Sequence, residues 1–587
     1  MKYRWSVFPK DDLTANYLSK TLNLPEIVAQ CLINRGIHDA DNARIFLKPQ
    51  LKNLSDPFLM PEMGKAVQRL FHAYENNELI VIFGDYDVDG VTSTAILYDF
   101  LNKFGWNAKY YLPNRIDEGY GLSRDGIKNC LEKYSARLIL AVDCGSNAVE
   151  VIKDLNKHNI DVIVLDHHQI SSEIPDAFAL VNPILGRIKN RRLYSDRKNC
   201  KEFCELCSVG IVFKLVHAIL KRAREIGFKE AHRIDIRKYL DLVALGTIAD
   251  LAPLIGENRI LVTAGLKKLN SEPSIGLASL IEVSSTRKPI GVHEIGFQVA
   301  PRLNAVGRLE TAEEAFQLLL ADSMDIALPL AQKLDAKNRE RQMIEYNIVE
   351  EALELINNKF NPDNDYVIVE AKQDWHIGVV GIVATRVMQQ FYRPTIIFGG
   401  DGNLFRGSCR SIEGFNITEA LKSCSNLLVK YGGHSMAAGV TIEPDKINLL
   451  REKLNCIARG TLKSENFIPS IEIDGEIKLS DLTSGLVEHL YRLEPFGNGN
   501  KEIIFLARNL KHQKPLIRVG SEKQHVKMWV TDGNAVFEAL WWHVGNDNNQ
   551  LPTGRFDLLF TPEINKFNGQ HYIVLKVIDW QKSENNN

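Results

Sequence analysis

The stretch LIVIFGD, residues 79–85, is the first of a series of short apolar runs separated by longer segments. Further runs follow as NAKYYLP (107–113), RLILAVDCG (137–145), IDVIVLDHH (160–168) and AFALVNP (177–183). The intervening segments have the length and the apolar spacing of helices. Strands that alternate with helices are typical of a parallel, doubly wound sheet, so this part of the chain is predicted to be an α/β domain.

The residue patterns on either side of this domain predict four further units. Residues 1–75 show helical spacing and little else, which predicts an N-terminal helical cap before the α/β domain of residues 76–310. The highly charged segment 311–360 indicates a long connecting helix. Strand patterns resume in 361–465, a second and smaller α/β domain, and dominate 466–582. Five or six short strands broken by turn residues suit a C-terminal β-barrel such as an OB-fold.

The composition excludes several classes of protein. The chain has 587 residues and a net charge of −2, which excludes a globally basic protein that coats DNA. No stretch approaches the ~20 consecutive apolar residues of a membrane span. The N-terminus, MKYRWSVFPKDDL, has no apolar core of signal-peptide length, so a cytoplasmic location is expected. The nine cysteines are too sparse for a disulfide scaffold and are expected to be thiols.

Two local features leave alternatives open. Residues 187–201 contain seven basic residues against one acid, and they form either a solvated loop or a surface that attracts phosphate. Cys200, Cys204 and Cys207 have the C-x3-C-x2-C spacing that radical enzymes use for a 4Fe–4S cluster. The triplet lies among basic residues and outside a (β/α)8 pattern, which favours chance spacing in a loop.

Three aspartates follow the first strand at alternate positions. In GDYDVDG, an extended backbone would point Asp85, Asp87 and Asp89 in the same direction. Three carboxylates that face one way repel one another unless a cation lies among them. Solvated loop aspartates are the alternative, but three acids at the end of a buried strand favour a cation site.

Other strands deliver acids and imidazoles to the same predicted edge. Asp143 ends the third run, and Asp166, His167 and His168 end the fourth. Ligand sites of open parallel sheets lie outside the carboxyl ends of the strands. Asp250, in GTIADLAPL, reads by itself as a residue at a helix terminus. Carboxylates with one imidazole suit hard divalent ions, so Mn²⁺ or Mg²⁺ is predicted.

The motifs GDYDVDG, AVDCG, DHH and GTIADLAPL, in this order, resemble the signature of the DHH phosphoesterase superfamily. APRLNAVGRL, GVVGIVATRV, RGSCRS and GGHSMAAG make the chain similar to the bacterial single-strand exonucleases of that superfamily. The resemblance implies catalytic residues that hold two Mn²⁺ or Mg²⁺ ions: Asp87, Asp89, Asp143, His167 and Asp250, with Asp85 beside them. It also implies that Asp166 orients this group and that His168 lies near the scissile phosphate.

The second α/β domain offers an anion site. RGSCRS supplies guanidinium groups and hydroxyls around a glycine, and GGHSMAAG supplies small residues that permit close backbone approach. Each motif is either a phosphate-binding loop or a tight structural turn. The resemblance favours phosphate binding and adds two arginines, so the predicted substrate-binding residues are Arg115, Arg308, Arg406, Ser408, Arg410, Ser411, Gly433 and His434.

Aromatic and basic residues mark the predicted barrel. Aromatic platforms beside a basic groove are how OB-folds hold single strands. About half of the aromatic residues on alternating strand positions should instead belong to the barrel core. The candidates for stacking on bases are Trp529, Trp541 and Trp542.

The predicted function is a metal-dependent exonuclease that degrades single-stranded DNA from the 5′ end to 5′-mononucleotides, in DNA repair and recombination. A water activated by two metals attacks the scissile phosphate. Expected partners are single-stranded DNA, a helicase and a single-strand-binding protein, with no membrane. One alternative is a DHH-family phosphodiesterase of short oligonucleotides or cyclic dinucleotides. The other is a non-catalytic replication scaffold, against which the presence of every carboxylate argues.

Overall fold

The computed structural model describes residues 3–114, 118–119, 121–171, 173–187, 203, 205–400, 402–544, 551–567 and 570–583. The predictions for Arg115, for Cys200 and Cys204, and for the basic stretch beyond Arg187 therefore lie outside the described residues. The chain divides into two compact units. One contains Gln50–Phe467, and the other joins Met1–Pro49 to Ile468–Asn587.

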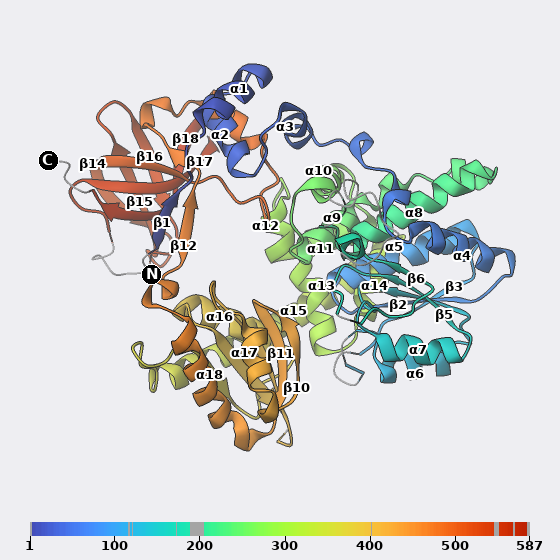
Figure 1. The fold of residues 1–587 in the computed structure, drawn as a ribbon. Coiled ribbons are helices and arrows are strands. Elements are labelled where there is room, and N and C mark those ends of the chain that lie inside the picture. The colour runs from blue at the N-terminus through green and yellow to red at the C-terminus, as the bar shows by residue number, and fades with distance from the viewer. Residues whose placement is uncertain are drawn as a thin grey trace. The chain divides into compact units, whose positions relative to one another are not determined.

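The predicted parallel sheet is present in the larger unit (Figure 1). Its strand order is β3-β2-β4-β5-β6. Its strands are β2 (Ile80–Gly84), β3 (Ala108–Tyr111), β4 (Leu138–Val142), β5 (Asp161–Leu165) and β6 (Ala179–Val181). All four pairings are parallel. In β2, Ile80 and Ile82 enter one apolar core while Val81 and Phe83 enter another. Both faces of the sheet are buried, as a parallel sheet requires.

Helices cover both faces of this sheet, and further helices continue the domain after its last strand, β6. Those nearest the sheet in sequence are α4 (Met63–Glu75), α5 (Val88–Phe104), α6 (Arg124–Lys133) and α7 (Val149–Lys157). They are followed by α8 (Ser208–Glu225), α9 (Leu240–Ala249), α10 (Gly256–Ser271), α11 (Ile275–Val283), α12 (Val292–Glu294), α13 (Ala300–Leu309) and α14 (Glu313–Leu320). The predicted connecting helix is α15 (Met324–Asn357), 34 residues long.

The second α/β domain is built on a mixed sheet of order β10-β11-β9-β8-β7. Its strands are β7 (Ile368–Ala371), β8 (Thr395–Gly400), β9 (Phe405–Arg410), β10 (Leu428–His434) and β11 (Ala437–Ile442). The helices are α16 (Val380–Phe391), α17 (Ile417–Ser423) and α18 (Ile447–Thr461). Residues of α17 and α18 fill one core, and residues of α15 and α16 fill another.

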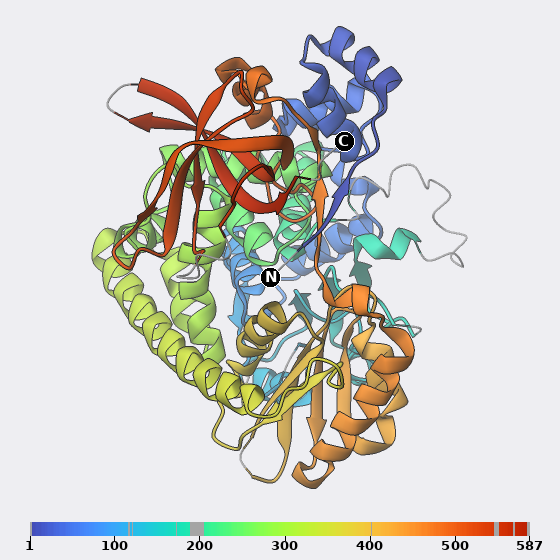
Figure 2. The same cartoon turned by 90° about the vertical axis from the view of Figure 1, so that its left-hand side faces the viewer.

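The smaller unit contains the predicted OB-fold, whose longer strands are drawn in red in Figure 2. The strands are β13 (Gly475–Glu476), β14 (Phe505–Val519), β15 (His525–Thr531), β16 (Val536–Trp541), β17 (Phe556–Phe567) and β18 (Gln570–Lys582). Pairing of β14 with β17 closes the barrel. A short parallel pair joins β1 (Arg4–Val7) to β12 (Ser470–Ile473), and α19 (Ser484–Tyr491) precedes β14.

The predicted helical cap over residues 1–75 is not one unit. Helices α1 (Asp12–Leu22), α2 (Glu26–Asn34) and α3 (Ala40–Leu47) share an apolar core with the barrel. Met63 and Leu70 of α4 instead enter the core beneath the parallel sheet. Helical spacing reports that a helix has an apolar face, but it does not report which core that face covers. Among the described residues, no helix is long and apolar enough to cross a membrane.

Candidate metal centre and phosphate-binding surface

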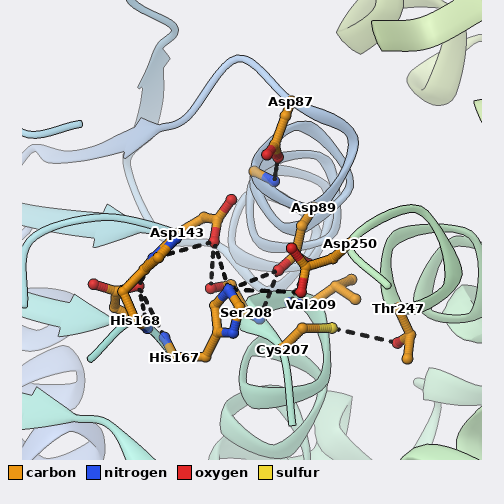
Figure 3. Close-up of polar contacts among 12 residues, drawn as sticks. Asp87, Asp89, Asp143, His167, His168, Cys207, Ser208, Val209, Thr247 and Asp250 are labelled. Carbon is orange, nitrogen blue, oxygen red and sulfur yellow. Dashed lines mark hydrogen bonds and ion pairs between the residues drawn. The ribbon is translucent and has the colours of Figure 1, made fainter. Parts of the chain in front are cut away.

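Acidic residues gather at the carboxyl ends of β2, β4 and β5 (Figure 3). Asp85 follows β2, Asp143 follows β4, and Asp166 begins the DHH run after β5. Asp250 joins them as the C-cap of α9, in agreement with its reading as a residue at a helix terminus. Asp85, Asp89, Asp143 and Asp166 are each only 1% exposed. The structure therefore brings together the residues that the sequence placed at one rim.

The extended backbone predicted for Asp85, Asp87 and Asp89 is wrong. Helix α5 begins at Val88, so Asp87 is its N-cap and accepts a 3.1 Å hydrogen bond from the Gly90 N–H. A Cβ at position 90 would lie 2.6 Å from the carbonyl oxygen of Asp85, so this close turn requires glycine. The turn splits the acids into two groups, because Asp85 and Asp87 lie near Asp143 while Asp89 lies near Asp250.

Asp143 turns into the site through an unusual backbone conformation. Its φ is 60°, in the left-handed region that non-glycine residues rarely adopt. Such conformations cost about 1–3 kcal/mol and persist where surrounding structure enforces them, commonly at functional sites. Here the Asp143 carboxylate accepts a 2.9 Å hydrogen bond from the Ser208 hydroxyl. The strained turn thus directs a buried carboxylate toward α8.

The N-terminus of α8 holds Asp89. The backbone N–H groups of Ser208 and Val209 donate 2.8 Å hydrogen bonds to its two oxygens. The first N–H groups of a helix lack intrahelical acceptors and favour a negative charge, so they position this buried carboxylate. Sequence reasoning missed both residues. The only signal was a serine at the head of the apolar run SVGIVFKLVHAIL.

Asp166 organises the two histidines. It accepts hydrogen bonds from the backbone N–H of His167 at 2.8 Å and from the His168 Nδ1 at 2.7 Å. Burial favours a raised pKa for Asp166, but the hydrogen bond and positive charge of His168 lower it below its usual range. Burial also opposes a charge on His168, yet Asp166 raises the pKa of that imidazole to about 9.

The carboxylates carry more negative charge than the protein itself balances. Burial, and then the charge of Asp87, raises the pKa of Asp89 to about 7. Burial and the charge of Asp89 raise the pKa of Asp250 to about 9, and the pKa of Asp143 also rises well above its ordinary value. Only a nearby cation would keep all of these groups ionised at neutral pH.

The ligand atoms are arranged to receive such cations. The His167 Nε2 lies 3.4, 3.7 and 4.0 Å from carboxylate oxygens of Asp143, Asp250 and Asp89. This nitrogen is buried and has no hydrogen-bond partner within the described parts of the chain. Close ligand atoms form three sets here: Asp85, Asp87 and Asp143; Asp143, His167 and His168; Asp89, Cys207 and Asp250. The first two sets share Asp143. The residues therefore fit more than one divalent ion.

Strands β9, β11 and β10 form a polar surface in the second α/β domain. Their register aligns Arg410 with Ala437 and His434. Two residues earlier in β9, Ser408 is aligned with Gly439 and Gly432. Two residues earlier again, Arg406 is aligned with Thr441 and Lys430. Alternate residues of a strand share a face, so Arg406, Ser408 and Arg410 lie on the same side. The residues of β11 that lie between Arg410 and His434 and between Ser408 and Gly432 are Ala437 and Gly439, which have small side chains.

Arg410 is held in place on this surface. Its Nε donates to the Thr385 hydroxyl of α16 at 3.1 Å, and its Nη1 donates to the Ser408 hydroxyl at 2.9 Å. Burial, and then the charge of His168, lowers the pKa of His167 to about 4, and His434 of this surface adds a smaller electrostatic effect in the same direction. Arg308 of α13 donates to the Gly378 carbonyl at 3.2 Å, just before α16.

Two other residues that were predicted to bind phosphate, Ser411 and Gly433, instead support the structure of the domain. The Ser411 hydroxyl is buried and donates a 2.6 Å hydrogen bond to the Phe415 carbonyl. Ser411 thus stabilises its own loop instead of facing the surface. Gly433 has a φ of 143°, and a Cβ there would lie 2.5 Å from the Ala438 Cα of the neighbouring strand. Only glycine fits this position.

Comparison with known proteins accounts for each domain. Family models match residues 79–247 (DHH family, N-terminal domain), 364–460 (DHHA1 domain) and 473–579 (RecJ OB domain). The single-stranded-DNA-specific exonuclease RecJ of Bacillus subtilis is 36% identical, over 99% of this chain and 71% of its own length. The chain belongs to the RecJ family. The Escherichia coli protein of the same name is 31% identical, over 95% of this chain and 96% of its own length.

Solved RecJ structures share the architecture. A crystal structure of RecJ from Thermus thermophilus in complex with Mn²⁺ has a TM-score of 0.82 and 26% identity, covering 99% of this chain and 80% of that one. The same protein in complex with Mg²⁺ has a TM-score of 0.77 and 25% identity, covering 99% of this chain and 79% of that one. Both complexes hold ions of the hard divalent class that fits the carboxylate-rich centre of this RecJ-family chain.

The three tryptophans that were predicted to stack on bases have different surroundings in the RecJ-type OB-fold. The Lys514 and Lys527 ammonium groups each lie over the ring of Trp529 of β15, 5.3 Å from its centroid. Trp542 is 49% exposed, and its ring contacts that of His525. Trp541 instead packs against the barrel core. Trp529 and Trp542 therefore remain available to a strand, whereas Trp541 is largely structural.

Proposed function

We propose that this chain hydrolyses single-stranded DNA from its 5′ end to 5′-mononucleotides, with two Mn²⁺ or Mg²⁺ ions as cofactors. The observation that carries the proposal is the convergence of the carboxylates of Asp89, Asp143 and Asp250 on the His167 Nε2. The names of the relatives support the substrate, and the metals in the Thermus thermophilus structures support the cofactors.

The residues divide between two ion positions. We assign Asp85, Asp87 and Asp143 to one, and Asp89, His167 and Asp250 to the other, with Asp143 close enough to serve both. Bound divalent ions supply an activated water and neutralise the charge that develops on the phosphate. The protein provides no side-chain nucleophile in this scheme. Its carboxylates hold the ions, and the N-terminus of α8 fixes Asp89 among them.

His168 acts on the phosphate side of the centre. The bond from Asp166 fixes the tautomer and orientation of this imidazole and favours its charged form. A charged imidazole held there donates to a non-bridging phosphate oxygen and stabilises the charge of the transition state. Asp166 is therefore a positioning residue, and His168 is the group that touches substrate.

End selection belongs to the second α/β domain. A terminal phosphate has more charge than an internal one, and it meets Arg410, Ser408 and His434 on the β9–β11–β10 surface. Strand polarity follows if this surface holds the 5′-phosphate while the adjacent linkage reaches the metal centre. Trp529 and Trp542 would bind downstream bases of the long single strand.

The proposed setting is cytoplasmic DNA repair and recombination. An enzyme that requires single strands depends on other proteins to expose them, so a helicase and a single-strand-binding protein are the proposed partners. The two alternative functions differ in substrate. A phosphodiesterase of dinucleotides would have no use for the tryptophans of the barrel, and a scaffold would have no use for a complete carboxylate set.

Labelled substrates test the proposal. Single strands and duplexes labelled at the 5′ or 3′ end are digested with Mn²⁺ by the wild type and by Asp89→Ala. Label is expected to leave first from the 5′ end of single strands, with no cleavage by the variant. Release first from the 3′ end would refute the polarity, and undiminished cleavage by Asp89→Ala would refute the metal centre. Preference for dinucleotides over long strands would favour the phosphodiesterase.

A further inference from the structure

A thiol lies at the edge of one proposed ion position. Cys207 is the N-cap of α8, is fully buried, and contacts the Thr247 hydroxyl with a sulfur-to-oxygen distance of 3.5 Å (Figure 3). Ligand atoms of Asp89, Cys207 and Asp250 all lie within 4.8 Å of one another. The thiol thus shares a ligand cluster with two carboxylates assigned to an ion.

The two ion positions differ in donor chemistry. Asp85, Asp87 and Asp143 offer only oxygen. The other position offers oxygen from Asp89 and Asp250 and sulfur from Cys207, whose ligand atoms form one set. The His167 Nε2 belongs to the set of Asp143 and His168, but it lies 4.0 and 3.7 Å from oxygens of Asp89 and Asp250 and can supply nitrogen to the same position. Oxygen ligands suit Mg²⁺ and Mn²⁺, whereas imidazole and thiolate ligands favour Zn²⁺. One position therefore offers only hard oxygen ligands, whereas the other offers a mixture of oxygen, sulfur and nitrogen ligands.

We propose that Asp89, His167, Cys207 and Asp250 form a second kind of metal site, which takes thiophilic divalent ions such as Zn²⁺ in competition with Mn²⁺ and Mg²⁺. The inference rests on the metal-ligand roles proposed above for Asp89, His167 and Asp250. On binding, a metal–sulfur bond forms and the thiol proton passes to solvent. The thiol leaves its contact with Thr247 to make this bond.

The four ligands explain why such an ion would inhibit. Zn²⁺ in proteins is usually tetrahedral, and sites with four protein ligands are structural because no position stays open for water or substrate. Hard ions leave the thiol on Thr247 and keep open positions, since they take oxygen ligands and retain waters. The same pocket thus has a catalytic state with hard ions and a closed state with soft ones.

Cobalt spectroscopy tests the sulfur ligand directly. The full-length protein is stripped with a chelator and titrated with Co²⁺, which substitutes for Zn²⁺ and shows a thiolate-to-metal charge-transfer band when sulfur is bound. The wild type is expected to show this band, and Cys207→Ser is expected to bind Co²⁺ without it. Cys144→Ser is the matched control, because Cys144 is also buried beside acids of the centre, Asp85 and Asp166. The control should retain the band.

Inhibition supplies the second measurement. Zn²⁺ is titrated into Mn²⁺-supported digestion of single strands, with each rate normalised to the same variant without Zn²⁺. The Zn²⁺ concentration for half inhibition should rise at least tenfold in Cys207→Ser, since loss even of a residue that only supports a ligand costs about 10–100-fold in metal affinity. Unchanged inhibition by Zn²⁺ would contradict the closed state.

The outcomes separate this inference from the proposed function. Co²⁺ binding to the wild type without a charge-transfer band, or a band that survives in Cys207→Ser, overturns the thiol ligand while leaving the exonuclease intact. Failure of the wild type to bind Co²⁺ or Mn²⁺ overturns both. Asp89→Ala should lose the band together with the activity. Thermal unfolding of each variant checks its fold, and the wild-type spectrum is decisive by itself.

Discussion

The backbone N–H of Ser208 donates a 2.8 Å hydrogen bond to Asp89, although the two residues are 119 positions apart in the chain. The hydroxyl of the same serine donates to Asp143 at 2.9 Å. One residue at the head of α8 therefore fixes the carboxylates of Asp89, in the first turn of α5, and of Asp143, which follows β4. The metal centre is preorganised by a helix terminus as well as by its ligands.

Ser208→Ala should weaken metal binding without removing a ligand. The backbone bond to Asp89 remains, but Asp143 loses its hydroxyl partner, so the Mn²⁺ concentration for half-maximal rate should rise about tenfold. Rates measured across a Mn²⁺ titration report the change. Ser208→Thr keeps a hydroxyl and should behave like the wild type. An Mn²⁺ dependence that is identical in all three proteins would exclude this role.

Asp166→Asn should lower the pH at which the rate begins to fall on the alkaline side. Burial by itself lowers the pKa of His168, and Asp166 raises it to about 9, so the imidazole is charged below that pH and loses its charge above it. Without the carboxylate the pKa of His168 falls, and the decline in rate should begin at lower pH. The measurement is a pH–rate profile at saturating Mn²⁺. His168→Gln should show no such limb, and an unshifted limb in Asp166→Asn would contradict the assignment.

The metal-free protein should lose stability as pH rises. The pKa values of about 7 for Asp89 and about 9 for Asp250 exceed 3.8, so the folded state binds protons that the unfolded chain has released. This stability is complete below pH 4 or so and disappears as pH rises through about 9. Mn²⁺ replaces those protons, so its stabilising effect should grow with pH.

Thermal unfolding across pH, with and without Mn²⁺, checks this expectation. Asp89→Asn removes one of the titrating carboxylates and should flatten the pH dependence of the metal-free protein. The same substitution should reduce the shift in Tm that Mn²⁺ produces. A metal-free Tm that climbs with pH across this range would show that the carboxylates are balanced by some other group.

Arg410→Ala should remove the preference for a phosphorylated end. A hydrogen bond to a charged group contributes about 1.5–3 kcal/mol, which corresponds to about 10–150-fold in kcat/KM. The measurement compares single strands that carry a 5′-phosphate or a 5′-hydroxyl. Ser411→Ala is the matched control, because its hydroxyl bonds internally to Phe415. It should lower stability by about 1 kcal/mol and leave the end preference intact.

Trp529→Ala and Trp541→Ala should affect different properties. The ring of Trp529 contacts two lysine ammonium groups and is only partly buried, so its loss should weaken binding of long single strands by about 1–3 kcal/mol with little change in stability. Trp541 packs against the core, so its loss should destabilise the barrel by about 2 kcal/mol or more. Fluorescence anisotropy and chemical denaturation measure the two effects. Equal effects on binding would argue against this division.

The sheet and its rim of acids could be predicted from local patterns along the chain. Alternating strands and helices specify a parallel sheet, and parallel strands bring their carboxyl ends to one edge. Asp143 and Asp166 were therefore predictable neighbours, although β4 and β5 are separated by α7. The barrel was equally visible, because short strands and turn residues are local signals.

The contacts between these elements could not be predicted in this way and became visible in the folded protein. It showed that Asp87 caps α5 while Asp89 belongs to it, that Ser208 and Cys207 reach the acids from α8, and that Ser411 faces inward. It also divided the N-terminal helices between two cores. The physical reason is common to all of these cases. Spacing along a chain records which face of an element is apolar, whereas hydrogen bonds and packing between distant segments depend on how the elements meet.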